Sequence, residues 1–191
     1  MNLEIERVTE GLAFPEGPVA LDDGSIAVCE IGAGVVTRVE ADGTKSPIAD
    51  VGGGPNGAAL GPDGALYVVN NGGFLWSEVA GMRIPLDLAT GANEPDGFTG
   101  GWVDRIDLAT GEVTTLYREC NGRLLHSPND IVFDADGGFW FTDLGKMREH
   151  DLDRGGVYYA RPDGSAITQP IRGLLGANGV GLSPDGGTLY V

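Results

Sequence analysis

One phrase occurs four times along the chain, and this repetition constrains the fold more than any other feature. Each copy contains a polar residue near its start, a short apolar run, a turn rich in Gly and Asp, and a second apolar run. The copies span residues 14–30, 54–70, 127–143 and 176–191. Repetition on this scale indicates an array of similar structural units that bury their apolar faces against one another.

Each copy is predicted to form a β-hairpin. Residues 65–69 (ALYVV), for example, follow the turn at 61–64 (GPDG), and short apolar runs around such a turn are typical of paired strands. Between the copies lies a second hairpin pattern with alternating apolar residues, which starts at Gly34, Gly101 and Gly155. Two hairpins in succession predict a unit of four strands.

The polar residues near the start of the four copies are Glu16, Asn56, Asn129 and Asn178, and their spacings are 40, 73 and 49 residues. A four-stranded propeller blade takes about 40–50 residues. The chain is therefore predicted to be an all-β protein, a β-propeller of four-stranded blades within a single domain, 1–191. The long second interval is explained by a loop-rich insertion at residues 71–100, which could cover a substrate site or close a gap between blades.

The fourth copy reaches Val191 inside its second strand, so about three and a half blades are expected by the spacing of blades. Propellers contain about four to eight blades. We expect the chain to be the N-terminal portion of a six-bladed ring of about 270–300 residues. The open strand edges of such a portion would favour association.

Composition limits the partners of the chain. Its 28 acidic and 12 basic residues give a net charge of −16, which argues against binding nucleic acid and is compatible with cations, small neutral molecules or simple solubility. No apolar run approaches the length of a membrane span, and the N-terminus lacks a signal-peptide pattern. Two cysteines, Cys29 and Cys120, form no disulfide framework. A cytoplasmic protein is expected.

The phrases FPEGPV, SPNDIVFDADGGFWFTD and GANGVGLSPDG, with GGVYYARPDGS between the last two, resemble the senescence-marker-protein (SMP-30), gluconolactonase and luciferin-regenerating-enzyme family. The resemblance covers nearly the whole chain. It implies a six-bladed propeller with one divalent metal ion, commonly calcium, in its central channel. It also implies hydrolysis of sugar lactones, the activity of many members.

The resemblance implies that Glu16, Asn129 and Asn178 are metal ligands. It places the fourth ligand, an Asp that is also thought to be the catalytic base, beyond Val191, so no catalytic residue is assigned within the chain. It further implies substrate contacts around Ser127 and Asp143.

Two other residues are candidates for substrate contact. Asn56 shares the repeat position of the predicted ligands, and direct ligation, water-mediated contact and a turn role remain open for it. His126 lies three residues before Asn129 and is expected near the mouth of the channel. There it could orient a substrate or transfer a proton, and its alternative is a surface loop histidine.

Oxygen ligands without Cys or His favour Ca²⁺, with Mg²⁺ or Zn²⁺ as alternatives. Such an ion can polarise a lactone carbonyl for attack by water. The predicted function is therefore metal-dependent hydrolysis of a lactone, a small-molecule substrate. One alternative is a non-catalytic propeller that binds a ligand or a protein, with its Asn side chains only stabilising turns. Another is a phosphotriester hydrolase on the same scaffold.

Overall fold

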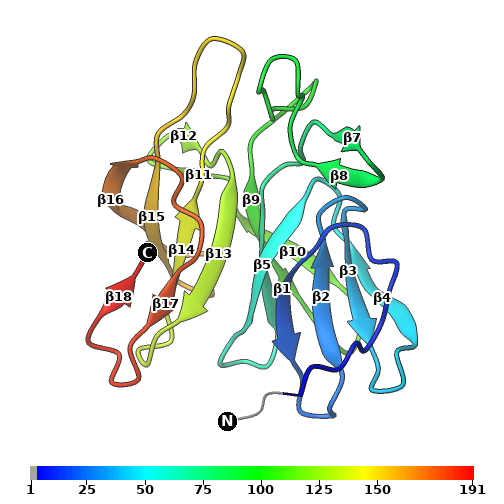
Figure 1. Ribbon diagram of the computed structural model, residues 1–191. Helices are drawn as coiled ribbons and strands as arrows, with labels where there is room; N and C mark the ends of the chain where they lie inside the picture. Colours follow the sequence, from blue (N-terminus) through cyan, green and yellow to red (C-terminus); the bar gives the residue numbers. More distant parts are fainter. Residues whose placement is uncertain (1–3) are drawn as a thin grey trace.

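The computed structural model describes residues 4–191 (Figure 1), and all of them lie in strands, turns or loops. The predicted all-β class is confirmed. Within this part of the chain there is no helix, and hence no helix long and apolar enough to cross a membrane.

Three antiparallel sheets of four strands follow one another along the chain. The first contains β1 (Pro15–Ala20), β2 (Ile26–Glu30), β3 (Val35–Val39) and β4 (Lys45–Asp50). The second contains β5 (Pro55–Leu60), β6 (Leu66–Asn70), β9 (Trp102–Ile106) and β10 (Val113–Tyr117). The third contains β13 (Pro128–Phe133), β14 (Phe139–Asp143), β15 (Gly155–Ala160) and β16 (Ile167–Leu174). The predicted four-stranded unit is thus present in each sheet.

Three two-stranded hairpins complete the described strands. The pair β17 (Gly181–Leu182) and β18 (Leu189–Tyr190) belongs to the fourth copy of the phrase, and β11 (Glu119–Cys120) pairs with β12 (Arg123–Leu124) between the second and third sheets. The predicted insertion, residues 71–100, joins β6 to β9 and contains the short hairpin β7 (Ser77–Val79) and β8 (Met82–Ile84). The number of blades in a complete ring stays a prediction.

The core consists of two apolar layers between successive sheets. Strand β6 contributes to both layers, because neighbouring side chains of a strand point to opposite faces. Leu66 and Val68 pack in the layer shared with the first sheet, whereas Tyr67 and Val69 pack in the layer shared with the third. All four are almost completely buried. The second sheet is therefore covered on both faces. The hydrophobic effect favours its packing between the first and third sheets.

The first strand of every four-stranded sheet has an irregularity at the same place. The pairing register shifts between Glu16 and Val19 in β1, and at the corresponding places in β5 and β13, between Pro55 and Ala58 and between Pro128 and Ile131. A bulge of this kind redirects the side chains beside it and is common next to functional sites. In each strand it adjoins the polar residue of the repeated phrase.

Glycines let these three first strands approach one another closely. A Cβ atom on Gly17 would lie 2.3 Å from the carbonyl oxygen of Asn56, and Gly17 has a positive φ of 52°. A Cβ atom on Gly57 would lie 2.6 Å from the Cα of Asp130. Backbone atoms occupy the space that a side chain would need, so only glycine permits this packing.

We expect Gly57→Ala to destabilise the fold by about 1–3 kcal/mol, because the new methyl group overlaps the backbone of β13. Gly181→Ala is the matched control, since Gly181 also lies in a strand and has nothing within 4 Å of its Cβ position. Its effect should stay within about 0.5 kcal/mol. Urea unfolding of the two variants and the wild type measures both values, and equal stabilities would contradict the steric account.

Candidate functional site

The four polar residues of the repeated phrase meet at one cavity. It has a volume of about 230 Å³, and its lining is drawn from β1, β5, β13 and the segment that precedes β17. The lining residues are Glu16, Gly17, Pro18, Asn56, Gly57, Asn129, Asp130 and Asn178. The structure therefore brings together the three predicted metal ligands and Asn56, although they are far apart in sequence.

Four of the polar side chains at this cavity, those of the repeated phrase, have no hydrogen-bond partner among residues 4–191, whereas Asp130 has two. Asn56 and Asn129 are each only 6% exposed, and neither side chain forms a hydrogen bond within residues 4–191. The same holds for the more exposed side chains of Glu16 and Asn178. Buried amides are nearly always hydrogen-bonded. Amide and carboxylate oxygens without partners around one small cavity fit a divalent cation that prefers oxygen ligands.

As formed by residues 4–191, the cavity lacks the clustered carboxylate, imidazole or thiolate side chains of many metal sites. In the part of the chain that the structure describes, no three His, Cys, Asp or Glu residues lie close enough together to hold a metal ion. Coordination at this cavity would thus depend on amide oxygens, with Glu16 as the free carboxylate.

Asp130 positions the segment that carries Asn178, a role that the sequence did not reveal. Its Oδ2 atom accepts a hydrogen bond of 2.8 Å from the backbone N–H of Val180, and its Oδ1 atom accepts one of 2.9 Å from that of Ile131. The hydroxyl of Thr142 donates to the backbone carbonyl of Asn178. Through its bond to Val180, Asp130 therefore ties β13 to the segment that precedes β17 at the cavity.

The polar residue that ends each of the first three copies has a repeated structural role. Glu30, Asn70 and Asp143 each accept a hydrogen bond from the backbone just before the first strand of their sheet. The donors are the N–H groups of Ala13 at 2.6 Å, Gly54 at 2.8 Å and Ser127 at 2.8 Å. These bonds fix the loop that delivers Glu16, Asn56 or Asn129 to the cavity.

The other predicted substrate contacts do not line this cavity. Asp143 accepts further hydrogen bonds from the N–H groups of His126 and Gly145, and with His126 it lines a separate pocket of about 440 Å³. Ser127 is completely buried, and its hydroxyl has no hydrogen-bond partner among residues 4–191. Contact of these three residues with a substrate stays a prediction. In the structure, the carboxylate of Asp143 accepts backbone hydrogen bonds that hold the surrounding loops in place.

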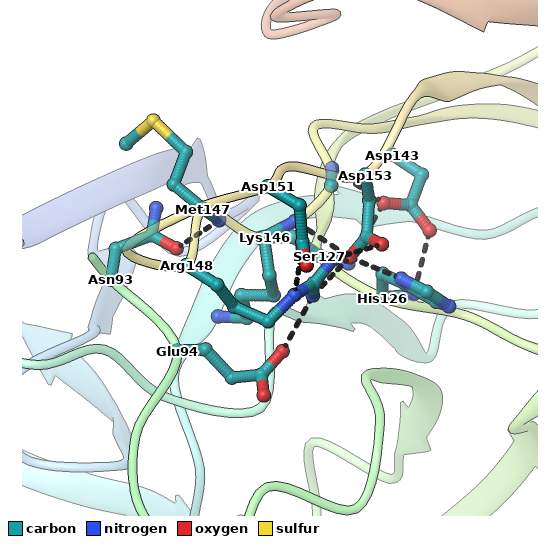
Figure 2. A network of polar contacts seen from close by, with 11 residues as sticks. Asn93, Glu94, His126, Ser127, Asp143, Lys146, Met147, Arg148, Asp151 and Asp153 are labelled. Atoms are coloured by element: carbon teal, nitrogen blue, oxygen red, sulfur yellow. Dashed lines mark hydrogen bonds and ion pairs between the residues drawn. The ribbon is translucent and has the colours of Figure 1, made fainter. Parts of the chain in front are cut away.

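A polar network joins the insertion to the loop between β14 and β15 (Figure 2). The backbone N–H of Met147 donates to the side chain of Asn93 at 2.8 Å, and the N–H of Asn93 donates to the carbonyl of Met147 at 2.9 Å. Arg148 forms ion pairs with Glu94 at 2.9 Å and with Asp153 at 2.8 Å. We call this set of contacts the clamp. It holds residues 71–100 against residues 144–154.

Lys146 lies at the centre of the clamp and is completely buried. Its ammonium donates a hydrogen bond of 2.5 Å to the carbonyl of Gly73 and lies 4.2 Å from the ring centroid of Phe74 and 5.0 Å from that of Phe98. Burial lowers the pKa of Lys146 to about 7. The insertion thus covers a lysine whose pKa is lower than that of an exposed lysine.

This pKa predicts a particular dependence of stability on pH. Between about pH 7 and the ordinary lysine pKa of 10.5, the unfolded chain binds more protons at Lys146 than the folded chain. The free energy of unfolding should therefore rise with pH in this window, by roughly 1 kcal/mol per pH unit. Urea unfolding from pH 7 to 9 should show this slope in the wild type.

Lys146→Met keeps the length of the side chain and removes its charge, so the slope should disappear in this variant. Lys45→Met removes an exposed lysine and should keep the slope. The same slope in the Lys146→Met protein as in the wild type would contradict the assignment of the pH dependence to Lys146.

Comparison with known proteins supports a lactonase relationship. Lactonase drp35 from Staphylococcus haemolyticus is 31% identical over 184 residues, which cover 95% of this chain and 48% of that relative. Lactonase drp35 from Staphylococcus saprophyticus is 50% identical over 64 residues, 33% of this chain and 19% of that relative. The chain thus spans about half the length of the first relative and less of the second.

Among solved structures, a gluconolactonase from Xanthomonas campestris superimposes with a TM-score of 0.68 at 25% identity. The superposition covers 94% of this chain and 54% of the gluconolactonase chain. A PQQ-bound aldose sugar dehydrogenase from Streptomyces coelicolor superimposes with a TM-score of 0.61 at 21% identity, over 95% of this chain and 57% of the dehydrogenase chain. At this identity the similarity shows the fold alone. The family described as SMP-30/gluconolactonase/LRE-like matches residues 14–191. The chain belongs to this family, and the expected resemblance is confirmed.

Proposed function

We propose that the protein is a divalent-metal-dependent hydrolase of a lactone, with the ion bound by Glu16, Asn129 and Asn178. Family membership and relatives named as lactonase or gluconolactonase support hydrolysis of a lactone. One structural observation supports the metal site: the side chains of Glu16, Asn56, Asn129 and Asn178 come from separate parts of the fold, line one cavity and form no hydrogen bond with another of residues 4–191. A sugar lactone is the proposed substrate class.

The donor set favours Ca²⁺, since hard cations of its size accept several carboxylate and amide oxygens in flexible geometry. When bound, the ion would polarise the lactone carbonyl and stabilise the negative charge that develops as water adds. Glu16 supplies a single negative charge to a divalent cation. The site would therefore keep a net positive charge with which to attract a carbonyl oxygen.

The residues around the cavity would act mainly by preorganising it. The bulges in β1, β5 and β13 aim the ligands, and the buried amides of Asn56 and Asn129 have little freedom to move. Asp130 fixes the segment of Asn178 through its bond to Val180. Because these contacts exist before a ligand arrives, little ordering of the site is required on binding.

The insertion is well placed to restrict access of water. The ring of Phe14, two residues before Glu16, packs edge-on against Trp76 of the insertion at a centroid distance of 5.1 Å. Figure 1 shows the insertion and the loop between β14 and β15 at the same end of the sheets, above the starts of β1 and β13. We propose that this end is the entrance through which substrate reaches the cavity.

Calcium titration calorimetry tests the metal site. The protein is freed of divalent cations, and Glu16→Gln is compared with Glu40→Gln, which changes an exposed glutamate in the turn between β3 and β4. We expect Glu16→Gln to weaken calcium binding at least tenfold, or by about 1.4 kcal/mol, because it removes the free carboxylate. Glu40→Gln should bind like the wild type.

Hydrolysis of gluconolactone by the protein, with and without calcium, tests the reaction. Turnover that requires calcium and is lost in Glu16→Gln supports the proposal. Calcium binding without turnover of any lactone would instead favour a binding propeller. Equal calcium affinity in the wild type and the Glu16→Gln variant would remove Glu16 from the site.

A further inference from the structure

The larger pocket, of about 440 Å³, lies between the β11–β12 hairpin and the third sheet. Strand β12, the residues that precede β15, and strands β15 and β16 contribute its walls. Six of the residues at its surface carry polar groups that could contact a ligand, namely Arg123, His126, Arg154, Tyr158, Gln169 and Arg172. None of them lines the cavity proposed for the metal ion.

Three guanidinium groups gather here, although the chain has only 12 lysines and arginines and a net charge of −16. Arg38 and Arg105 each form an ion pair with an aspartate elsewhere in the structure, and Arg148 pairs with Asp153 beside the pocket. In contrast, Arg123 and Arg154 form no ion pair or side-chain hydrogen bond with any of residues 4–191, and Arg172 donates only to the carbonyl of Gln169, at 3.5 Å. The pocket thus collects positive charge that the protein itself leaves unpaired.

The two carboxylates at the pocket already have hydrogen-bond partners, and among residues 4–191 neither forms an ion pair with Arg123, Arg154 or Arg172, which outnumber them. Asp143 accepts three backbone hydrogen bonds, from His126, Ser127 and Gly145. Asp153 is paired with Arg148 and with the imidazole of His126. Hydrogen bonds from Arg148 and His126 hold the pKa of Asp153 at about 2 against the opposing effect of burial.

Tyr158 adds a buried donor. It is 7% exposed, and its ring stacks on Phe141 with centroids 4.9 Å apart and planes 11° apart. Its hydroxyl, at the surface of the pocket, makes no hydrogen bond with another described residue. Burial and the charge of Asp143 raise the pKa of Tyr158, whereas Arg123 and Arg172 lie close enough to lower it. The phenol therefore stays protonated and is surrounded by two guanidinium groups.

We propose that this pocket is a binding site for the carboxylate or phosphate group of a small organic anion. The guanidinium groups of Arg123 and Arg172 would bind the oxyanion by charge-assisted hydrogen bonds, and the hydroxyl of Tyr158 would donate a further one. Arg154 adds positive charge at the rim. The volume of about 440 Å³ accommodates a small molecule rather than an isolated ion alone. The site is independent of the proposed metal site.

Titration calorimetry with two probes, inorganic phosphate and succinate, tests this proposal. The protein is freed of metal ions on a chelating resin, because a dissolved polyanionic chelator would compete for the pocket. Ionic strength is kept constant, since weak ion pairs are screened by salt. We expect at least one probe to bind with a stoichiometry of one and a Kd of about 1 mM or below. The stronger probe identifies phosphate or carboxylate as the preferred group.

Variants locate the binding. Arg172→Ala and Arg123→Ala should each weaken binding of the more tightly bound probe about tenfold. Tyr158→Phe, which keeps the stacked ring, should weaken its binding severalfold. Arg161→Ala is the matched control, because Arg161 is an exposed arginine just after β15 that does not line the pocket. It should bind as the wild type does. The absence of binding of both probes at about 10 mM, or an equal loss in Arg161→Ala and Arg172→Ala, would overturn the proposal.

Discussion

The close backbone packing of β1, β5 and β13 is the constraint on which the rest of the structure depends. Gly17 and Gly57 remove the side chains that would keep these strands apart, and a bulge in each strand turns its polar residue toward the shared cavity. Wider spacing of the strands would separate Glu16, Asn56 and Asn129. The repeated phrase therefore places one oxygen-bearing side chain per unit around a common point, and the apolar layers on β6 fix how the sheets stack.

The polar residues that end the first three copies support this cavity from the surrounding loops. Glu30, Asn70 and Asp143 tie down the loops before the first strands, and Asp130 ties the third sheet to the segment of Asn178. The clamp similarly fixes the insertion, at the end of the sheets where β1 and β13 begin (Figure 1). Such support contributes little to binding by direct contact. It sets the geometry before a ligand arrives and so reduces the loss of conformational entropy on binding.

The sequence predicted the strands, the four-stranded units and the meeting of Glu16, Asn56, Asn129 and Asn178, because equivalent positions in repeated units occupy equivalent places in space. It could not predict contacts that no repeat encodes. Asp130 and Val180 are 50 residues apart, and Lys146 and Gly73 are 73 apart. His126 illustrates the limit: its nearness in sequence to Asn129 predicts a place near the mouth of the channel, which stays a prediction, but does not reveal that it lines the arginine-lined pocket. That pocket depends on a hairpin and a sheet whose side chains meet only in the folded chain.

The most direct test of the central claim is a crystal structure of the full-length protein with manganese, whose anomalous scattering locates the ion without assumptions about its ligands. The account predicts a single strong peak in the cavity, in contact with the carboxylate of Glu16 and the amide oxygens of Asn129 and Asn178. A cavity containing only water, or an ion bound elsewhere in the molecule, would contradict it.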